Sequence, residues 1–375
     1  MINIGKTTTL LWVLVFSLSC SEPVKYNSTL KEAFKEDFLV GAALSAYRVM
    51  GKDSMTNILL EQQFNTITPE NSMKWERIHP KPGIYNFQVA DRFVALGEEK
   101  EMHLVAHTLI WHNQTPHWVF MDSEGNLASR DTLLMRMRDH IYTIMGRYKG
   151  KIHSWDVVNE AIKDDGSLKE SLWYQIIGDD YIEKAFQYAR EADPGAHLIY
   201  NDFSLASRAK REGTVRLIEQ LQSKGIRIDG IGMQGHYDMT YPNLKELEAS
   251  IVAFSELGVE VMITELDVSV LPWPDLPQGA EVTSRFKYRA ELDPYQDGLP
   301  DSVQLKLADR YTDLFRIFVK HSDKISRVTF WGVDDGKSWK NNFPVRGRSD
   351  YALLFDHNYG PKPAYHAVIR TAQPE

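Results

Sequence analysis

The chain has 375 residues, of which 43% are hydrophobic and 25% are charged, and this balance excludes a disordered or fibrous protein. A chain of this length buries roughly three quarters of the surface of its unfolded state, so its core needs neither a metal nor a disulfide, for which the single cysteine has no intramolecular partner. The formal net charge of −8 argues against nucleic acid as a partner, so we expect a neutral or small-molecule substrate.

Residues 1–19 have the pattern of a secretory signal peptide. An apolar run from Leu10 to Leu18 follows a polar start that contains one cation, Lys6, and the run is shorter than the roughly 20 residues that span a bilayer. A small residue followed by cysteine, Ser19-Cys20, is typical of a bacterial lipoprotein signal. We therefore expect export and a lipid on Cys20, with plain cleavage as the alternative. No later stretch is apolar enough to cross a membrane, so any membrane contact would pass through this anchor.

Residues 24–372 are predicted to form one domain, because they contain no repeat, no low-complexity tract and no linker. Short apolar runs of strand length recur along them, most of them apolar on both faces, as buried parallel strands require. The runs are Phe38–Ser45, Phe64–Asn71, Met102–Trp111, Ile152–Glu160, His197–Ser204, Gly230–Asp238, Val259–Val268 and Ser326–Asp335.

Amphipathic helical stretches lie between these runs. Tyr181–Ala192 is followed by Asp193-Pro194-Gly195, and Thr214–Lys224 is followed by Gly225, which are helix stop signals. Eight strand-then-helix units predict an α/β fold of the (β/α)₈ TIM-barrel type. The segment 271–300, rich in Pro, Gly and charge, would then hang over the catalytic face. A doubly wound open sheet is the competing arrangement, although no Gly-rich phosphate loop follows the first run.

Two of the runs finish with a glutamate where a strand should give way to a loop. These residues are Glu160 in the fourth run and Glu265 in the seventh. Ionised carboxylates are expensive to place among buried apolar residues, and functional groups of a barrel come from the carboxyl ends of different strands. One such glutamate could simply mark the end of a strand, but two favour chemistry. Paired carboxylates on a barrel are typical of glycoside hydrolysis.

The other strand ends offer groups that suit a sugar. Flat apolar rings stack on sugar faces, and fixed polar groups bind the hydroxyls. By alternation, His107 and Trp111 share one face of the third run, and Gln234 and His236 share one face of the sixth. The remaining candidates are Glu70, Asn71 and Lys74 at the second run and Trp331 and Trp339 at the eighth.

At these residues the sequence resembles a xylanase of glycoside hydrolase family 10. The similarity extends in order from about residue 38 to 366. The matching segments are Thr68-Pro69-Glu70-Asn71-Ser72-Met73-Lys74-Trp75, His107-Thr108-Leu109-Ile110-Trp111-His112, Trp155-Asp156-Val157-Val158-Asn159-Glu160-Ala161, Tyr200-Asn201-Asp202, Gly232-Met233-Gln234-Gly235-His236, Ile263-Thr264-Glu265-Leu266-Asp267, and Trp331-Gly332-Val333 with Ser338-Trp339.

The resemblance implies retaining hydrolysis of internal β-1,4 bonds in xylan, without a metal or other cofactor. Glu160 then matches the general acid/base and Glu265 the nucleophile. Asn159 would bind the 2-hydroxyl of the sugar being cleaved, while His236, oriented by Asp267, and Gln234 would keep the nucleophile ionised and aimed. The residues matching the glycone side and its aromatic cage are Glu70, Asn71, Lys74, His107, Trp111, Trp331 and Trp339.

One position departs from the family pattern. The family usually carries Tyr-Asn-Asp-Tyr-Asn after the fifth strand, whereas this chain has Tyr200-Asn201-Asp202-Phe203-Ser204. Phe203 keeps a ring for stacking but has no phenol hydroxyl, so an aglycone-side hydrogen bond is expected to be missing.

Two other classes of function are alternatives to this one. A metal-dependent hydrolase would need closely spaced ligands, and neither His-x-His nor His-Glu-x-x-His occurs among the 12 histidines. A lipid-anchored xylan-binding protein without activity is the non-catalytic alternative, and the joint presence of Asn159, Glu160 and Glu265 speaks against it. The sequence carries no signal for oligomeric state.

Overall fold

The computed structural model describes residues 28–274 and 286–372. The predicted signal peptide, Cys20 and the middle of the 271–300 segment lie outside these residues. Within them, no helix has the length and apolar character needed to cross a bilayer.

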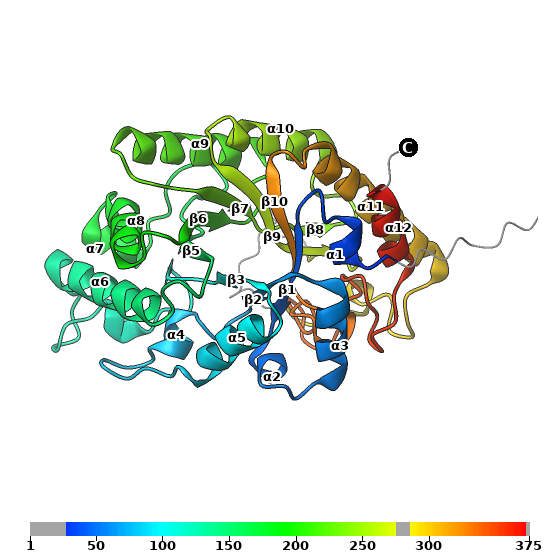
Figure 1. Ribbon diagram of the computed structural model, residues 1–375, viewed down its shortest axis with the longest axis horizontal. Helices are drawn as coiled ribbons and strands as arrows, with labels where there is room; N and C mark the ends of the chain where they lie inside the picture. The colour runs from blue at the N-terminus through cyan, green and yellow to red at the C-terminus, as the bar shows by residue number, and fades with distance from the viewer. Residues whose placement is uncertain (1–27, 275–285, 373–375) are drawn as a thin grey trace, which may run out of the picture.

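Eight parallel strands close into a barrel, which confirms the predicted (β/α)₈ fold (Figure 1). The strands follow one another in chain order, and the last strand pairs with both the seventh and the first. An open doubly wound sheet has two free edges, so this closure excludes that alternative. The barrel strands are β1 (Leu39–Leu44), β2 (Thr66–Pro69), β3 (His103–Ala106), β5 (Ser154–Asn159), β6 (His197–Asp202), β7 (Gly230–Met233), β9 (Glu260–Ser269) and β10 (Ile325–Phe330).

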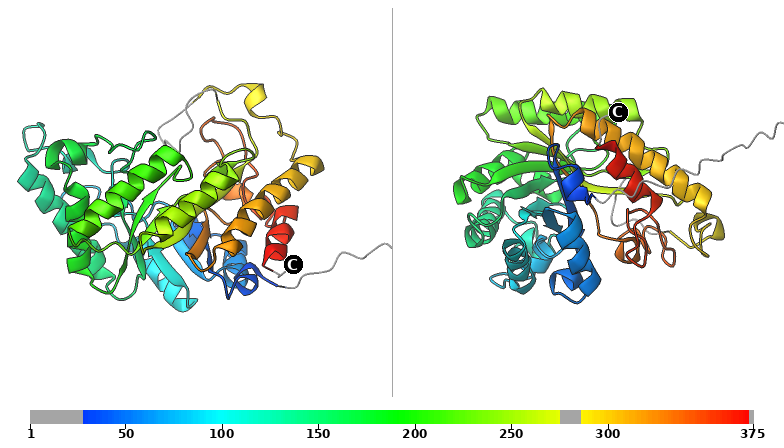
Figure 2. Two further views of the ribbon diagram at one scale, coloured as in Figure 1. Left: turned by 90° about the horizontal axis from the view of Figure 1, so that it is seen from above. Right: turned by 45° about the vertical axis from the view of Figure 1, so that its right-hand side comes forward.

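Helices surround the strands, and α9, α10 and α11 run alongside one another across the outside, with α12 beside α11 (Figure 2). The helices are α1 (Leu30–Ala33), α2 (Ala46–Val49), α3 (Ser54–Gln63), α4 (Trp75–Ile78), α5 (Gln88–Glu99), α6 (Arg130–Arg147), α7 (Leu172–Ile177), α8 (Tyr181–Ala192), α9 (Arg208–Ser223), α10 (Leu244–Ser255), α11 (Asp301–Lys320) and α12 (Pro363–Thr371). The part of the chain that the structure describes also contains three single turns of 3₁₀ helix, η1 (His117–Val119), η2 (Ala290–Leu292) and η3 (Asp335–Lys337).

Local sequence signals account for the boundaries of these elements. Helix α8 covers the predicted range and buries Ile182, Ala185, Phe186 and Ala189, the helical spacing of a face that packs on strands. All six residues of β5 are buried, as expected of a parallel strand covered on both faces. Ser129 caps α6 by accepting a hydrogen bond from the amide of Thr132.

Three predicted elements differ from the structure. The third apolar run is broken after Ala106 and resumes as β4 (Ile110–Trp111), while the sixth is broken after Met233 and resumes as β8 (His236–Asp238). In the second break Gly235 has a φ of 84°, a conformation that glycine adopts without strain. Helix α9 begins at Arg208, six residues before the predicted start, because its first turn buries Lys210 instead of an apolar side chain.

Candidate active site

The carboxyl ends of the barrel strands enclose a cleft of about 530 Å³, within the roughly 300–1,000 Å³ range of ligand pockets. All of the predicted catalytic and substrate-binding residues line it except Asp267, which is fully buried behind His236. The lining also contains Asn113, Gln114, Asn341, Asn342 and Phe343, which the sequence analysis did not single out.

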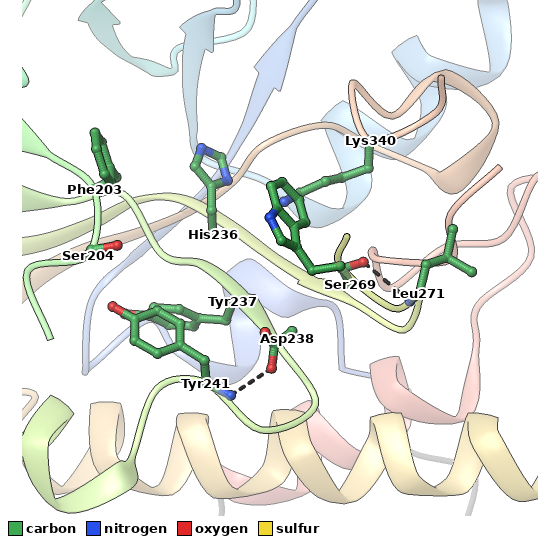
Figure 3. Close-up of a pocket in the computed structure, with 10 residues that line it drawn as sticks. Phe203, Ser204, His236, Tyr237, Asp238, Tyr241, Ser269, Leu271 and Lys340 are labelled. Atoms are coloured by element: carbon green, nitrogen blue, oxygen red, sulfur yellow. Dashed lines mark hydrogen bonds between the residues drawn. The ribbon is translucent and has the colours of Figure 1, made fainter. Parts of the chain in front are cut away.

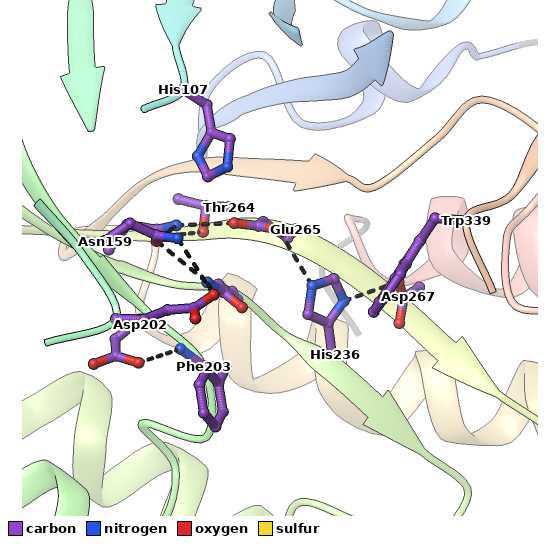
Figure 4. A network of polar contacts seen from close by, with 12 residues as sticks. His107, Asn159, Asp202, Phe203, His236, Thr264, Glu265, Asp267 and Trp339 are labelled. Carbon is purple, nitrogen blue, oxygen red and sulfur yellow. Dashed lines mark hydrogen bonds and ion pairs between the residues drawn. The ribbon is translucent and has the colours of Figure 1, made fainter. Parts of the chain in front are cut away.

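Glu265 accepts hydrogen bonds on both carboxylate oxygens. Nδ2 of Asn201 lies 2.8 Å from Oε1, and Nε2 of His236 lies 3.2 Å from Oε2 (Figure 4). Burial acts to raise the pKa of Glu265, but the hydrogen bond from His236 and nearby positive charges outweigh it, so this pKa is lowered. The side chain is therefore held as a carboxylate, the form that a nucleophile requires.

A second carboxylate orients His236. Oδ2 of Asp267 lies 2.9 Å from Nδ1 of His236 and also accepts a hydrogen bond from Nε1 of Trp339 at 2.7 Å. Burial acts to lower the pKa of His236, but Asp267 and Glu265 raise it to about 8. At neutral pH the imidazolium donates from both ring nitrogens, one to each carboxylate. The predicted orientation of His236 by Asp267 agrees with this geometry.

Glu160 lies among neutral donors. Its Oε2 accepts from Nε1 of Trp111 at 2.9 Å, and its Oε1 accepts from Nε2 of Gln234 at 3.0 Å and from Nδ2 of Asn159 at 3.3 Å. Its backbone φ of 58° is in the left-handed region, an uncommon conformation that clusters at functional sites. The two glutamates therefore have different hydrogen-bond partners, a charged imidazolium for Glu265 and neutral side chains for Glu160, which suits separate nucleophile and acid roles.

Gln234 contacts Glu160 and not Glu265, the glutamate that was predicted. It was expected to support Glu265, but its side-chain amide donates to Glu160 instead. Asn201 takes the expected place beside the nucleophile and is itself oriented by Thr264, whose hydroxyl donates to Oδ1 of Asn201 at 2.6 Å. Asn201 stands in the fifth apolar run, so the rule that singled out polar residues at strand ends would also have found it.

Asn159 joins the two halves of the site. Its Oδ1 accepts from Nδ2 of Asn201 at 3.0 Å and from Nε2 of Gln234 at 3.3 Å. These amides also donate to Glu265 and Glu160, so one chain of hydrogen bonds connects the two carboxylates. Such a network fixes the side chains relative to each other before a substrate binds.

The predicted glycone-side residues form a polar wall with an aromatic face. Nζ of Lys74 lies 3.1 Å from Oδ1 of Asn71 and 4.7 Å from the ring centre of Trp111. Nδ1 of His107 lies 2.8 Å from Oδ2 of Asp156. Burial raises the pKa of Glu70 to about 7, against the opposing positive charges. This wall therefore offers both donors and acceptors to sugar hydroxyls.

The two predicted tryptophans also line the cleft. Trp331 packs edge-on against His107, with ring centres 5.3 Å apart, and Trp339 stacks on Phe343 at 4.8 Å. Trp331 directly follows β10, and Trp339 follows η3. Residues from two separate loop positions thus supply the aromatic surface.

Alternation along a strand does not explain how two predicted pairs reach the cleft. His107 lies in the break after β3 and Trp111 in β4, whereas Gln234 lies in the break after β7 and His236 begins β8. The alternation argument therefore does not apply to either pair, although all four side chains line the cleft.

A second, more apolar pocket adjoins the cleft at His236, which lines both (Figure 3). Phe203, Tyr237, Tyr241, Leu271 and Trp273 contribute to its walls. The beginning of the 271–300 segment thus reaches the catalytic end of the barrel. Within residues 28–274 and 286–372, no cluster of three or more His, Cys, Asp or Glu side chains is arranged to hold a metal ion.

Comparison with known proteins gives consistent matches over nearly the whole chain. Residues 29–371 match the family described as Glycosyl hydrolase family 10. An endo-1,4-beta-xylanase A of Xylanibacter ruminicola is 45% identical over 91% of this chain and 93% of its own length. A beta-1,4-xylanase of Dictyoglomus thermophilum is 42% identical over 96% of this chain and 97% of its own.

Solved structures agree. A GH10 endoxylanase retrieved from a sugarcane soil metagenome has a TM-score of 0.88 and 46% identity, covering 91% of this chain and 99% of that one. A mutant structure in complex with xylotriose has a TM-score of 0.81 and 39% identity, with coverage of 91% and 99%.

Proposed function

The chain belongs to glycosyl hydrolase family 10 and is a retaining endo-1,4-β-xylanase. From this activity we propose the roles of its catalytic residues. Glu265 is the nucleophile and Glu160 the general acid/base. The observation that carries this assignment is the difference in their partners: His236 and Asn201 hold Glu265, whereas Trp111, Gln234 and Asn159 hold Glu160.

In the first half-reaction, an oxygen of Glu265 attacks the anomeric carbon while Glu160 gives its proton to the departing glycosidic oxygen. The products are a covalent glycosyl-enzyme and the released aglycone chain. In the second half-reaction, Glu160 takes a proton from water, which attacks the same carbon and releases Glu265. Two inversions return the β configuration. Asn159 binds the 2-hydroxyl of the reacting sugar throughout.

The glycone wall binds and orients the xylose units that precede the scissile bond. Glu70, Asn71, Lys74 and His107 supply hydrogen bonds, and Trp111, Trp331 and Trp339 supply ring faces. The intact set of catalytic and binding side chains leaves no support for a protein that only binds xylan.

Hydrolysis of unsubstituted xylo-oligosaccharides, followed by proton NMR, tests the mechanism. We expect the β-anomer of the new reducing end to be formed first, with the α-anomer rising only through mutarotation. Freshly dissolved crystalline xylose, a single anomer, gives the rate of mutarotation under the same conditions. Initial formation of the α-anomer would mean single displacement and would remove the nucleophile role of Glu265.

We also propose that the enzyme is exported and carries a lipid on Cys20, while residues 24–372 form the catalytic domain. The support is the apolar run before Ser19-Cys20. In a bacterial host fed a radiolabelled fatty acid, the wild-type protein is expected to be labelled and to sediment with membranes. Cys20→Ala should lose the label, whereas Ser21→Ala, the matched control, should keep it. Equal labelling of the two variants would refute the anchor.

A further inference from the structure

A buried ion pair lies beside the cleft, outside the set of residues that line it. Nζ of Lys210 is 2.8 Å from Oδ1 of Asp202, and both side chains are fully buried. Asp202 ends β6, and Lys210 lies in the first turn of α9. A buried ion pair adds little net stability compared with apolar residues of similar size. Net stability therefore does not account for this pair, whereas its contacts with neighbouring segments give it a structural role.

The other oxygen of Asp202 holds the loop that follows the acid/base. Oδ2 accepts hydrogen bonds from the amide of Ile162 at 3.2 Å and from the hydroxyl of Tyr200 at 2.5 Å. The same hydroxyl accepts from the amide of Ala161 at 3.2 Å. Burial and the Asp202 carboxylate hold the pKa of Tyr200 well above its usual value, so the phenol keeps the proton it donates. One carboxylate thus fixes two successive amides directly after Glu160.

Glu160 needs such support because of its backbone. Its left-handed φ of 58° is unfavourable for a residue with a side chain, and such conformations persist only when the surroundings enforce them. Its own amide donates to the carbonyl of Asn201 at 2.9 Å. Three consecutive amides, from Glu160 to Ile162, are therefore held by β6.

Helix α9 supports the far end of the same loop. A Cβ atom at Gly213 would come within 2.3 Å of the carbonyl oxygen of Gly166, so the helix and the loop touch backbone to backbone. Nη2 of Arg216 donates to the same carbonyl at 3.1 Å. Lys210 and Gly213 are three residues apart and lie on one face of α9. The loop is thus docked on this helix at Gly166.

Lys210 also contacts the leaving-group side of the site. Its Nζ lies 3.4 Å from the ring centre of Phe203, and the amide of Phe203 donates to Oδ1 of Asp202 at 2.8 Å (Figure 4). Phe203 lines the apolar pocket that adjoins the cleft. The ion pair therefore sets the position of the acid/base loop relative to this ring.

We propose that Asp202 and Lys210 are positioning residues for proton transfer by Glu160. They hold the loop so that the carboxyl group of Glu160 faces the glycosidic oxygen, to which it passes its proton as the bond to the anomeric carbon breaks. The proposal rests on the acid/base role of Glu160. A small shift of this loop weakens proton transfer and leaves attack by Glu265 intact.

The test compares aryl β-xylobiosides whose leaving groups differ in acidity. With Asp202→Asn or Lys210→Met, kcat/KM for xylo-oligosaccharides and for phenyl xylobioside is expected to fall by about tenfold or more, because both leaving groups need a proton. For the 2,4-dinitrophenyl substrate, whose leaving group needs none, we expect a change of less than about twofold. Tyr200→Phe removes the hydroxyl bridge and should show the same selectivity if either charge variant fails to fold.

The matched control is Asp193→Asn. Asp193 is also a buried carboxylate that accepts backbone amides, from Gly150 and Gly195, but it precedes β6 at the opposite end of the barrel. It should change stability without changing the ratio between the two classes of substrate.

Equal loss on activated and unactivated substrates would overturn the proposal, because a merely structural role lowers both by reducing the fraction of active enzyme. Glu160→Ala, assayed alongside, distinguishes failure of the positioning role from failure of the acid/base role. If that variant shows leaving-group selectivity and the Asp202 and Lys210 variants do not, only the positioning role fails. If Glu160→Ala shows none, the acid/base assignment itself fails.

Discussion

Replacing Glu265 with alanine is expected to lower kcat on xylan and on every aryl xylobioside by at least about 10⁴-fold, because no other group can form the glycosyl-enzyme. Asn201 and His236 hold the carboxylate at the anomeric centre, and removing it leaves these donors with no nucleophile to present. The activity on a substrate whose leaving group needs no proton should fall as far as the activity on xylan. Initial rates and active-site titration with dinitrophenyl xylobioside measure the effect.

Glu265→Gln provides the matched control for folding. It keeps the volume of the side chain and an oxygen for the hydrogen bond from Asn201, so its thermal unfolding should resemble that of the wild type while its activity is lost. Substantial turnover by Glu265→Ala on activated substrates, beyond contamination by wild type, would show that another residue attacks the sugar.

Replacing Glu160 with alanine is expected to have a selective effect. On xylan, kcat/KM should fall by roughly 100- to 10,000-fold, the usual range for loss of general acid catalysis. On dinitrophenyl xylobioside the first step should be spared, whereas the second slows because no base activates water. The intermediate then accumulates, so kcat and KM fall together and a burst of dinitrophenol precedes slow turnover.

Azide tests the same assignment independently. It needs no base to attack, so it should restore turnover of the dinitrophenyl substrate by Glu160→Ala and yield the β-glycosyl azide. Asn113→Ala removes a different side chain of the cleft lining and should show neither the burst nor the rescue. Loss of equal size on activated and unactivated substrates, with no effect of azide, would contradict the acid/base role.

The breaks in the third and sixth runs show where prediction from the chain alone is limited. Each break does coincide with polar or glycine residues, His107-Thr108 after Ala106 and Gln234-Gly235 after Met233. Because strand-like residues follow them, these positions were interpreted as parts of one continuous strand. The residues beyond each break still line the cleft, but because the chain bends there and not because side chains alternate along one strand. A turn inside an apolar run is set by pairing with neighbouring strands.

The start of α9 was missed for a related reason. Its first turn buries Lys210 and its second buries Gly213, so the apolar periodicity that marks a helix begins only later. A lysine is recognised as buried only when its partner is known, and Asp202 comes from another element. Lys210 was therefore absent from the sequence analysis, and Asp202 appeared there only as part of a matching segment, without a role.

The amino-acid sequence by itself determined the order of strands and helices and the placement of Glu160 directly after a strand, because these depend on local periodicity. Glu265 was also expected at a strand end, but it lies inside β9, four residues before that strand ends at Ser269. The tertiary structure decided which amide serves which carboxylate. Asn159 lies opposite Asn201 in the β5–β6 pairing only after a register shift between Asp156 and Val158. Register between strands is a property of the closed barrel, so the partners of the two glutamates become visible only there.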